Sequence, residues 1–179
     1  LFVGQFLQAQ KQDIQLEDIW LYYKFVPGFP AEFNWMNDDD YYSVLEDGKI
    51  VKKSIKNEKD VEDIVDIGSL QDPVTQEEVE ASSYTFNDDE SKILLKSGIE
   101  KIYRRSSKEV CFVYDRNSKK VSKLHDGKKV SFATFSPDAT KIGYVYENDL
   151  YYHDFNTEKR IRVTDDGKFN EIINGGTDW

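Results

Sequence analysis

The sequence predicts an all-β fold, namely an incomplete β-propeller of about three four-stranded blades with a short helix between blades. A motif of an aromatic residue, a polar turn and an apolar strand recurs three times along the chain. Aromatic residues, which favour the half-buried surface of a sheet, make up 14% of the sequence. Repeats of about 40 to 50 residues that each contain several short strands are typical of propeller blades.

The repeated motif ends its first strand on an aromatic side chain, and successive motifs are 51 and then 49 residues apart. Asp and Asn suit the turn that follows, because their side chains hydrogen-bond to the backbone two residues further on. Pro137 presets φ in the third turn. The three segments are 33–45, 84–95 and 133–145, and their aromatic residues are Trp35, Phe86 and Phe135.

Each repeat continues with further strands separated by turn signals. In the first repeat, Asp47 and Gly48 form a strong hairpin signal between two apolar runs. The predicted later strands are 110–114 and 120–124 in the second repeat and 150–154 and 160–164 in the third. Three blades leave strand edges and blade faces bare. We therefore expect the chain to be part of a larger propeller.

One segment, 60–68, departs from the strand pattern. Val61, Ile64 and Val65 have the spacing of one helical face, and Gly68 stands where a helix would end. The segment is therefore predicted to be the short helix between blades.

The composition argues against a nucleic-acid-binding protein. The net charge is −10 and the isoelectric point is about 4.7, so the chain has no basic stripe to neutralise phosphates. The acidic stretch 72–80 is expected to be a solvated connection between blades, with a docking surface as the alternative.

The reactive residue types give no sign of a metal centre or a cofactor. Cys111 is the one cysteine, which excludes an internal disulfide and a multi-cysteine metal site, and its apolar surroundings predict a buried strand thiol. The acidic turns 38–40 and 87–90 lack the ligand pattern of an EF-hand. His125 and His153 lie far apart in the sequence, without a nucleophile in triad spacing, so catalysis by either is not expected.

Residues 1–13 are predicted to be an N-terminal arm or a signal-peptide remnant, and residues 14–179 to be the partial propeller. The first ten residues are apolar and small, they do not begin with Met, and residues 8–10 would suit cleavage. A short first strand is the alternative.

Four short motifs stand out along the chain: Leu16–Trp20, Tyr103–Ser106, Asn148–Tyr151 and Asn174–Trp179. They resemble the N-terminal part of the propeller of the dipeptidyl peptidase IV family, the prolyl oligopeptidase-type serine peptidases. Together they extend the resemblance over nearly the whole chain. The absence of an Asn-x-Ser/Thr glycosylation motif would suit a bacterial member.

The resemblance implies a secreted or periplasmic protein, with a membrane anchor as an option. Members of the family are serine exopeptidases that release N-terminal dipeptides and prefer Pro at the second position. Their eight-bladed propeller covers a C-terminal α/β-hydrolase domain, and some form homodimers. The implied partners are therefore a peptide substrate, that hydrolase domain and a second copy of the protein, but no nucleic acid.

The resemblance implies one substrate-binding residue in this chain, Arg104, which matches the family's arginine at the substrate's backbone carbonyl. Without the resemblance, Arg104 would be interpreted as a solvated turn residue. The family's acidic pair would follow Trp179, and the Gly-x-Ser-x-Gly nucleophile motif does not occur in this sequence. The chain alone is therefore expected to be inactive. The alternatives are a non-enzymatic propeller of the cell envelope that binds peptides or proteins, or a small self-sufficient β domain.

Overall fold

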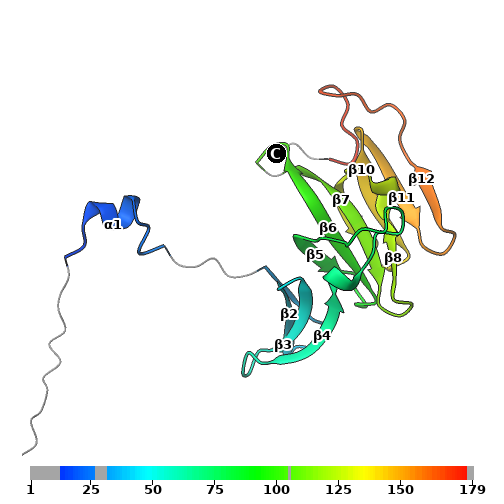
Figure 1. The fold of residues 1–179 in the computed structure, drawn as a ribbon. Helices are drawn as coiled ribbons and strands as arrows, with labels where there is room; N and C mark the ends of the chain where they lie inside the picture. The colour runs from blue at the N-terminus through cyan, green and yellow to red at the C-terminus, as the bar shows by residue number, and fades with distance from the viewer. Residues whose placement is uncertain (1–12, 27–31, 105, 177–179) are drawn as a thin grey trace, which may run out of the picture. The chain divides into compact units, whose positions relative to one another are not determined.

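The computed structural model describes residues 13–26, 32–104 and 106–176 (Figure 1). The chain divides into two compact units, Leu1–Pro30 and Ala31–Trp179. The described part of the first unit contains helix α1 (Leu16–Trp20), and that of the second contains three four-stranded sheets. The arm or signal-peptide remnant predicted for residues 1–13 lies, apart from Asp13, outside the described residues.

Helix α1 is a short helix whose first turn is held by a capping contact. Gln15 N donates to Asp18 Oδ2 at 3.0 Å. Lys24 pairs with the same carboxylate at 2.6 Å, and its hydrogen bond lowers the pKa of Asp18. Among the described residues, no helix is long and apolar enough to cross a membrane.

The three sheets confirm the predicted four-stranded blades. In each blade, consecutive strands pair antiparallel in chain order, as a series of hairpins does. Blade 1 consists of β1 (Phe33–Trp35), β2 (Tyr41–Glu46), β3 (Lys49–Ser54) and β4 (Asp60–Asp66). Blade 2 consists of β5 (Ser83–Phe86), β6 (Lys92–Lys101), β7 (Ser107–Asp115) and β8 (Lys120–Lys123). Blade 3 consists of β9 (Ser131–Phe135), β10 (Lys141–Tyr146), β11 (Asp149–Asp154) and β12 (Lys159–Arg162).

The helix predicted over 60–68 is wrong for most of its length, because Asp60–Asp66 form strand β4. A single 3₁₀ turn, η1 (Ile67–Ser69), follows the strand and leads out of blade 1. The pairing of β4 with β3 shifts register twice, and each shift leaves one residue of β4 unpaired, Val61 and Ile64. An extra residue in a strand breaks the alternation of faces, so the apolar side chains acquired a spacing that resembles a helix.

Blade 2 lies between the other two blades and is buried on both faces. On β7, Phe112 and Tyr114 belong to the core shared with blade 1, whereas Cys111 and Val113 belong to the core shared with blade 3. Successive side chains of a strand point to opposite faces, so one strand serves both cores. The alternation of these four residues therefore holds the three blades together.

The Cys111 thiol is buried, as predicted, and burial raises its pKa to about 12. The acidic connection between blades 1 and 2 is exposed over 73–78, as predicted for a solvated connection. Its two ends are anchored, however, because Val79 and Asp72 are buried and the Asp72 carboxylate pairs with Lys123.

Candidate functional site

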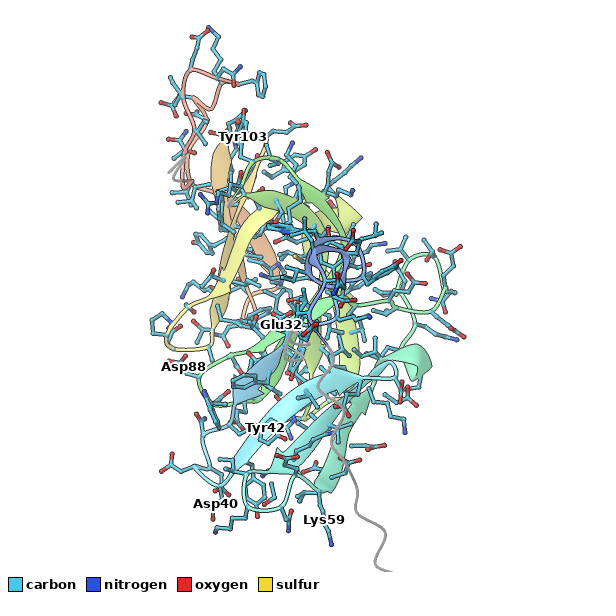
Figure 2. All side chains as sticks on the ribbon, turned by 90° about the vertical axis from the view of Figure 1, so that its left-hand side faces the viewer. Glu32, Asp40, Tyr42, Lys59, Asp88 and Tyr103 are labelled. Atoms are coloured by element: carbon cyan, nitrogen blue, oxygen red, sulfur yellow. The ribbon has the colours of Figure 1, made fainter. Side chains whose placement is uncertain are left out.

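The candidate site begins at the tip of the β6–β7 hairpin, which contains the two longest strands in the described part of the chain (Figure 1). At the tip, the backbone N–H groups of Ile102 and Tyr103 both donate to Ser106 O, at 2.9 and 3.3 Å. Arg104 lies in this tight turn and is exposed to solvent. Figure 2 shows Tyr103 far from Asp88, which lies in the β5–β6 turn at the other end of the same blade.

A cavity of about 730 Å³ lies between this hairpin tip and blade 3. The cavity is lined by four segments that are distant from one another in the sequence. They are the hairpin end (Glu100, Ile102, Tyr103, Ser106, Lys108), the approach to and start of β9 (Lys128, Lys129, Ser131, Phe132), the end of β10 with the β10–β11 turn (Val145, Tyr146, Glu147, Asn148) and the C-terminal segment (Phe169, Asn170, Glu171, Ile173, Gly176). Arg104 is not among the lining residues, but its neighbour Tyr103 is.

The cavity combines apolar surface with paired charges. Three aromatic side chains on its lining are more than a third exposed, Tyr103 (59%), Phe132 (38%) and Phe169 (74%). Glu100 pairs with Lys129 at 3.0 Å, and that contact lowers the pKa of Glu100. Concave sites that hold small molecules or peptides are mostly apolar with a few polar groups, so the lining suits a ligand of mixed character.

The C-terminal segment is fixed against blade 3 by its backbone. Asn174 N donates to Asn148 O at 2.9 Å, next to the cavity. Gly175 has φ +70°, and a Cβ there would lie 3.0 Å from both Leu150 Cδ1 and Val145 Cγ2. The close approach therefore favours glycine in this part of the Asn174–Trp179 motif.

Three of the four motifs that were recognised in the sequence meet at this cavity. Tyr103–Ser106 contributes the hairpin tip, Asn148–Tyr151 contributes Asn148, and Asn174–Trp179 contributes Gly176. Arg105 and residues 177–179 lie outside the described residues. Sequence reasoning assigned no role to Asp149, although this carboxylate accepts hydrogen bonds from the C-terminal segment. The signal that could have found it is its position in one of these motifs, directly after a turn and before an apolar strand.

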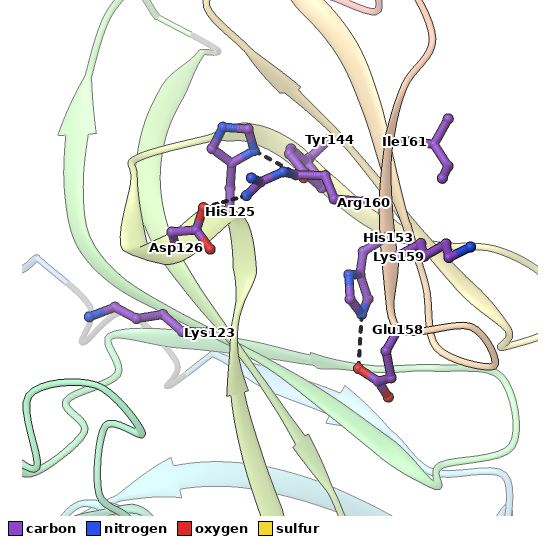
Figure 3. A pocket seen from close by; sticks show the side chains of 9 residues that line it. All are labelled: Lys123, His125, Asp126, Tyr144, His153, Glu158, Lys159, Arg160 and Ile161. Atoms are coloured by element: carbon purple, nitrogen blue, oxygen red, sulfur yellow. Dashed lines mark hydrogen bonds and ion pairs between the residues drawn. The ribbon is translucent and has the colours of Figure 1, made fainter.

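The two histidines line a second pocket, of about 490 Å³, between η2 (Leu124–Gly127) and β11–β12 (Figure 3). His125 Nδ1 lies 3.0 Å from the Tyr144 hydroxyl, and burial, followed by the charge of Arg160, lowers the pKa of His125. His153 Nε2 lies 3.5 Å from Glu158.

The described residues that line this pocket include no serine, threonine or cysteine that could act as a nucleophile beside either histidine. A hydrolytic triad needs such a group. Within the described residues, no group of three or more His, Cys, Asp or Glu side chains is placed to hold a metal ion.

Comparisons with known proteins point to one family. The family model described as "Dipeptidyl peptidase IV (DPP IV) N-terminal region" matches residues 87–179. The chain is 26% identical to prolyl endopeptidase FAP of Mus musculus over 147 residues, which cover 82% of this chain and 18% of that protein. It is 30% identical to dipeptidyl aminopeptidase B of Saccharomyces cerevisiae over 143 residues, covering 79% of this chain and 14% of that protein.

The fold agrees with these sequence matches. The crystal structure of Porphyromonas gingivalis dipeptidyl peptidase 4 is similar to this chain with a TM-score of 0.79 and 25% identity, over 96% of this chain and 24% of that one. The chain thus spans less than a quarter of the length of each of these three relatives. Because the family model covers more than half of the sequence, the chain belongs to the dipeptidyl peptidase IV family, as part of its N-terminal region.

Proposed function

We propose that the chain is the N-terminal propeller part of a secreted serine exopeptidase that releases N-terminal dipeptides, with Pro preferred at the second position. In this proposal the chain positions and gates the peptide, while a C-terminal α/β-hydrolase domain of the whole protein, which could be a homodimer, performs the cleavage. The observation that supports it best is the meeting of three distant motifs at one cavity of about 730 Å³. The matches to peptidases of the family support the same proposal.

Arg104 is the residue we assign to the peptide. It lies at an exposed hairpin tip beside Tyr103, which lines the cavity. A guanidinium is always charged and donates two parallel hydrogen bonds, so it can hold a backbone carbonyl in a defined orientation. The apolar side chains of Phe132 and Phe169 would accept the ring of a proline residue.

The test is the Arg104→Ala variant in the full-length protein, assayed with a Gly-Pro chromogenic substrate. We expect kcat/KM to fall by about 10- to 100-fold, the effect of losing a hydrogen bond to a charged group. Arg104→Lys should recover part of this loss. Lys119→Ala is the matched control. Lys119 is an exposed cation in the turn that follows β7, whereas Arg104 lies in the turn that precedes β7.

A wild-type full-length protein that releases no dipeptide would contradict the proposed activity. An active wild type whose kcat/KM is unchanged by Arg104→Ala would contradict the role of Arg104 alone. The alternative function, peptide binding by a propeller without catalysis, predicts that calorimetry detects peptide binding while no cleavage product forms. The exposed aromatic side chains on the cavity lining would suit such peptide binding.

A further inference from the structure

Asp149, the first residue of β11, carries a buried carboxylate that the C-terminal segment (residues 163–176) surrounds with hydrogen-bond donors. Burial opposes ionisation of this group, but the donors outweigh it, so the pKa of Asp149 lies below its usual value. The donors are Thr164 Oγ1 and Gly167 N at 2.9 Å, Asn174 Nδ2 at 3.3 Å and, from β12, Arg162 Nη2 at 2.5 Å.

The backbone of the segment is also held at close range beside this carboxylate. A Cβ on Gly167 would lie 2.6 Å from Asn148 O, so only glycine allows the Gly167 amide to reach Asp149. Asn174 bridges the two ends of the segment, because its side chain donates to Asp166 Oδ1 at 2.9 Å as well as to Asp149. One carboxylate thus collects contacts from both ends of the segment.

The segment that Asp149 holds forms one wall of the cavity. Phe169, Ile173 and Gly176 line the cavity, whereas Asp149 does not. Any effect of Asp149 on a bound peptide must therefore act through the position of this wall. An asparagine at 149 would replace one acceptor oxygen by an NH₂ group, which would face N–H donors that are already in place.

We propose that Asp149 is a positioning residue for substrate binding, which fixes the C-terminal segment as one wall of the cavity. This inference rests on the proposed function, since it assigns the cavity to the peptide substrate. Displacing a wall that contacts the substrate equally in the ground state and the transition state raises KM and leaves kcat unchanged.

The experiment compares Asp149→Asn with Asp154→Asn in the full-length protein, using a Gly-Pro chromogenic substrate and enzyme concentrations from active-site titration with a serine-directed reagent. Asp154 is the matched control, because it ends the same strand and accepts backbone hydrogen bonds from Asn156 and Thr157 at 2.9 and 3.0 Å. We expect KM to rise about tenfold or more in Asp149→Asn, with kcat per titrated site unchanged, and neither to change in Asp154→Asn. Gly167→Ala, which displaces the segment without altering a charge, should raise KM in the same way.

If the wild type cleaves the substrate but KM is unchanged in Asp149→Asn or in Gly167→Ala, the positioning role is wrong and the proposed function stands. A lower melting temperature of Asp149→Asn, with KM and kcat per titrated site both unchanged, would mark Asp149 as purely structural and would also overturn the inference. If Asp149→Asn does not fold, the result with Gly167→Ala decides. If the wild type itself cleaves nothing, the proposed function fails first.

Discussion

At the scale of single residues, carboxylates at strand ends organise this chain. Asp115 ends β7, where it pairs with Lys92 Nζ at 2.5 Å and accepts hydrogen bonds from Ser118 N at 2.7 Å and Ser118 Oγ at 3.0 Å. Burial raises the pKa of Asp115, but the hydrogen bonds from Lys92 and Ser118 lower it by more. The pKa of Asp115 is therefore about 2. Asp115 thereby joins the β6 and β7 strands to the turn that starts β8.

The lowered pKa of Asp115 predicts a loss of stability in acid. Because its pKa is about 2 in the folded protein and 3.8 in the reference state, its ionised form stabilises the fold above about pH 4. This stabilisation, roughly 1 to 2 kcal/mol for a partly exposed group, is lost as the pH falls from about 4 to about 2. The free energies of unfolding of wild type and Asp115→Asn, measured by urea titration, should therefore converge over this range. Lys92→Met should move the acid transition to higher pH, and a pH-independent difference between wild type and Asp115→Asn would contradict the account.

At the scale of elements, the central blade carries two cores on opposite faces of the same strands. Leu94 and Leu95 on β6 are neighbours in sequence and both are fully buried. Leu94 packs in the core shared with blade 3, and Leu95 in the core shared with blade 1. A strand that is apolar on both faces has to be buried on both, so β6 joins its neighbouring blades on either side.

This arrangement predicts two different consequences of similar substitutions. Leu94→Ala and Leu95→Ala should each lower the free energy of unfolding by about 2 to 5 kcal/mol, because each leaves a cavity in a packed core. Hydrogen exchange should then separate them: Leu94→Ala should accelerate exchange in β9–β12, and Leu95→Ala in β1–β4. Equal acceleration in both blades for both variants would show that the two cores are not separate. Lys119→Ala serves as the exposed control.

At the scale of the whole molecule, blade 1 has an aromatic face that nothing in the described chain covers. Phe33, Trp35 and Tyr42 pack edge to face with ring centroids 5.2 to 6.3 Å apart. The pairing of β1 with β2 places these three side chains on the face of the sheet opposite Ser43, which contacts blade 2 through the Tyr84 hydroxyl. Trp35 is 66% exposed. Neighbouring blades of a propeller pack face to face, so we expect a further blade of the whole protein to cover this cluster.

If a further blade covers this face in the full-length protein, Trp35→Ala should destabilise that protein. We expect the free energy of unfolding to fall by about 2 kcal/mol or more, as for a large aromatic side chain removed from a packed interface. Val74→Ala, at a 72% exposed position in the connection between blades 1 and 2, should change it by less than about 0.5 kcal/mol. Equal small effects of both substitutions would mean that Trp35 is exposed in the whole protein too.

The sequence by itself determined the local parts of this fold. The three aromatic-ended strands, the hairpin at Asp47 and Gly48 and the buried thiol of Cys111 were all predicted, because turn chemistry and strand alternation depend on neighbouring residues. The segment 60–68 was predicted wrongly, since the two extra residues of β4 are visible only once β4 is paired with β3.

Only the tertiary structure decided the site. It brought the Tyr103–Ser106, Asn148–Tyr151 and Asn174–Trp179 motifs to one cavity and gave Asp149 its donors from the C-terminal segment. The sequence singled out Arg104 and the Asn174–Trp179 motif through their resemblance to a family, but it did not indicate that the segment containing this motif forms a wall of the cavity. Contacts between residues far apart in a chain depend on how whole blades pack, and no local pattern of residues encodes that packing.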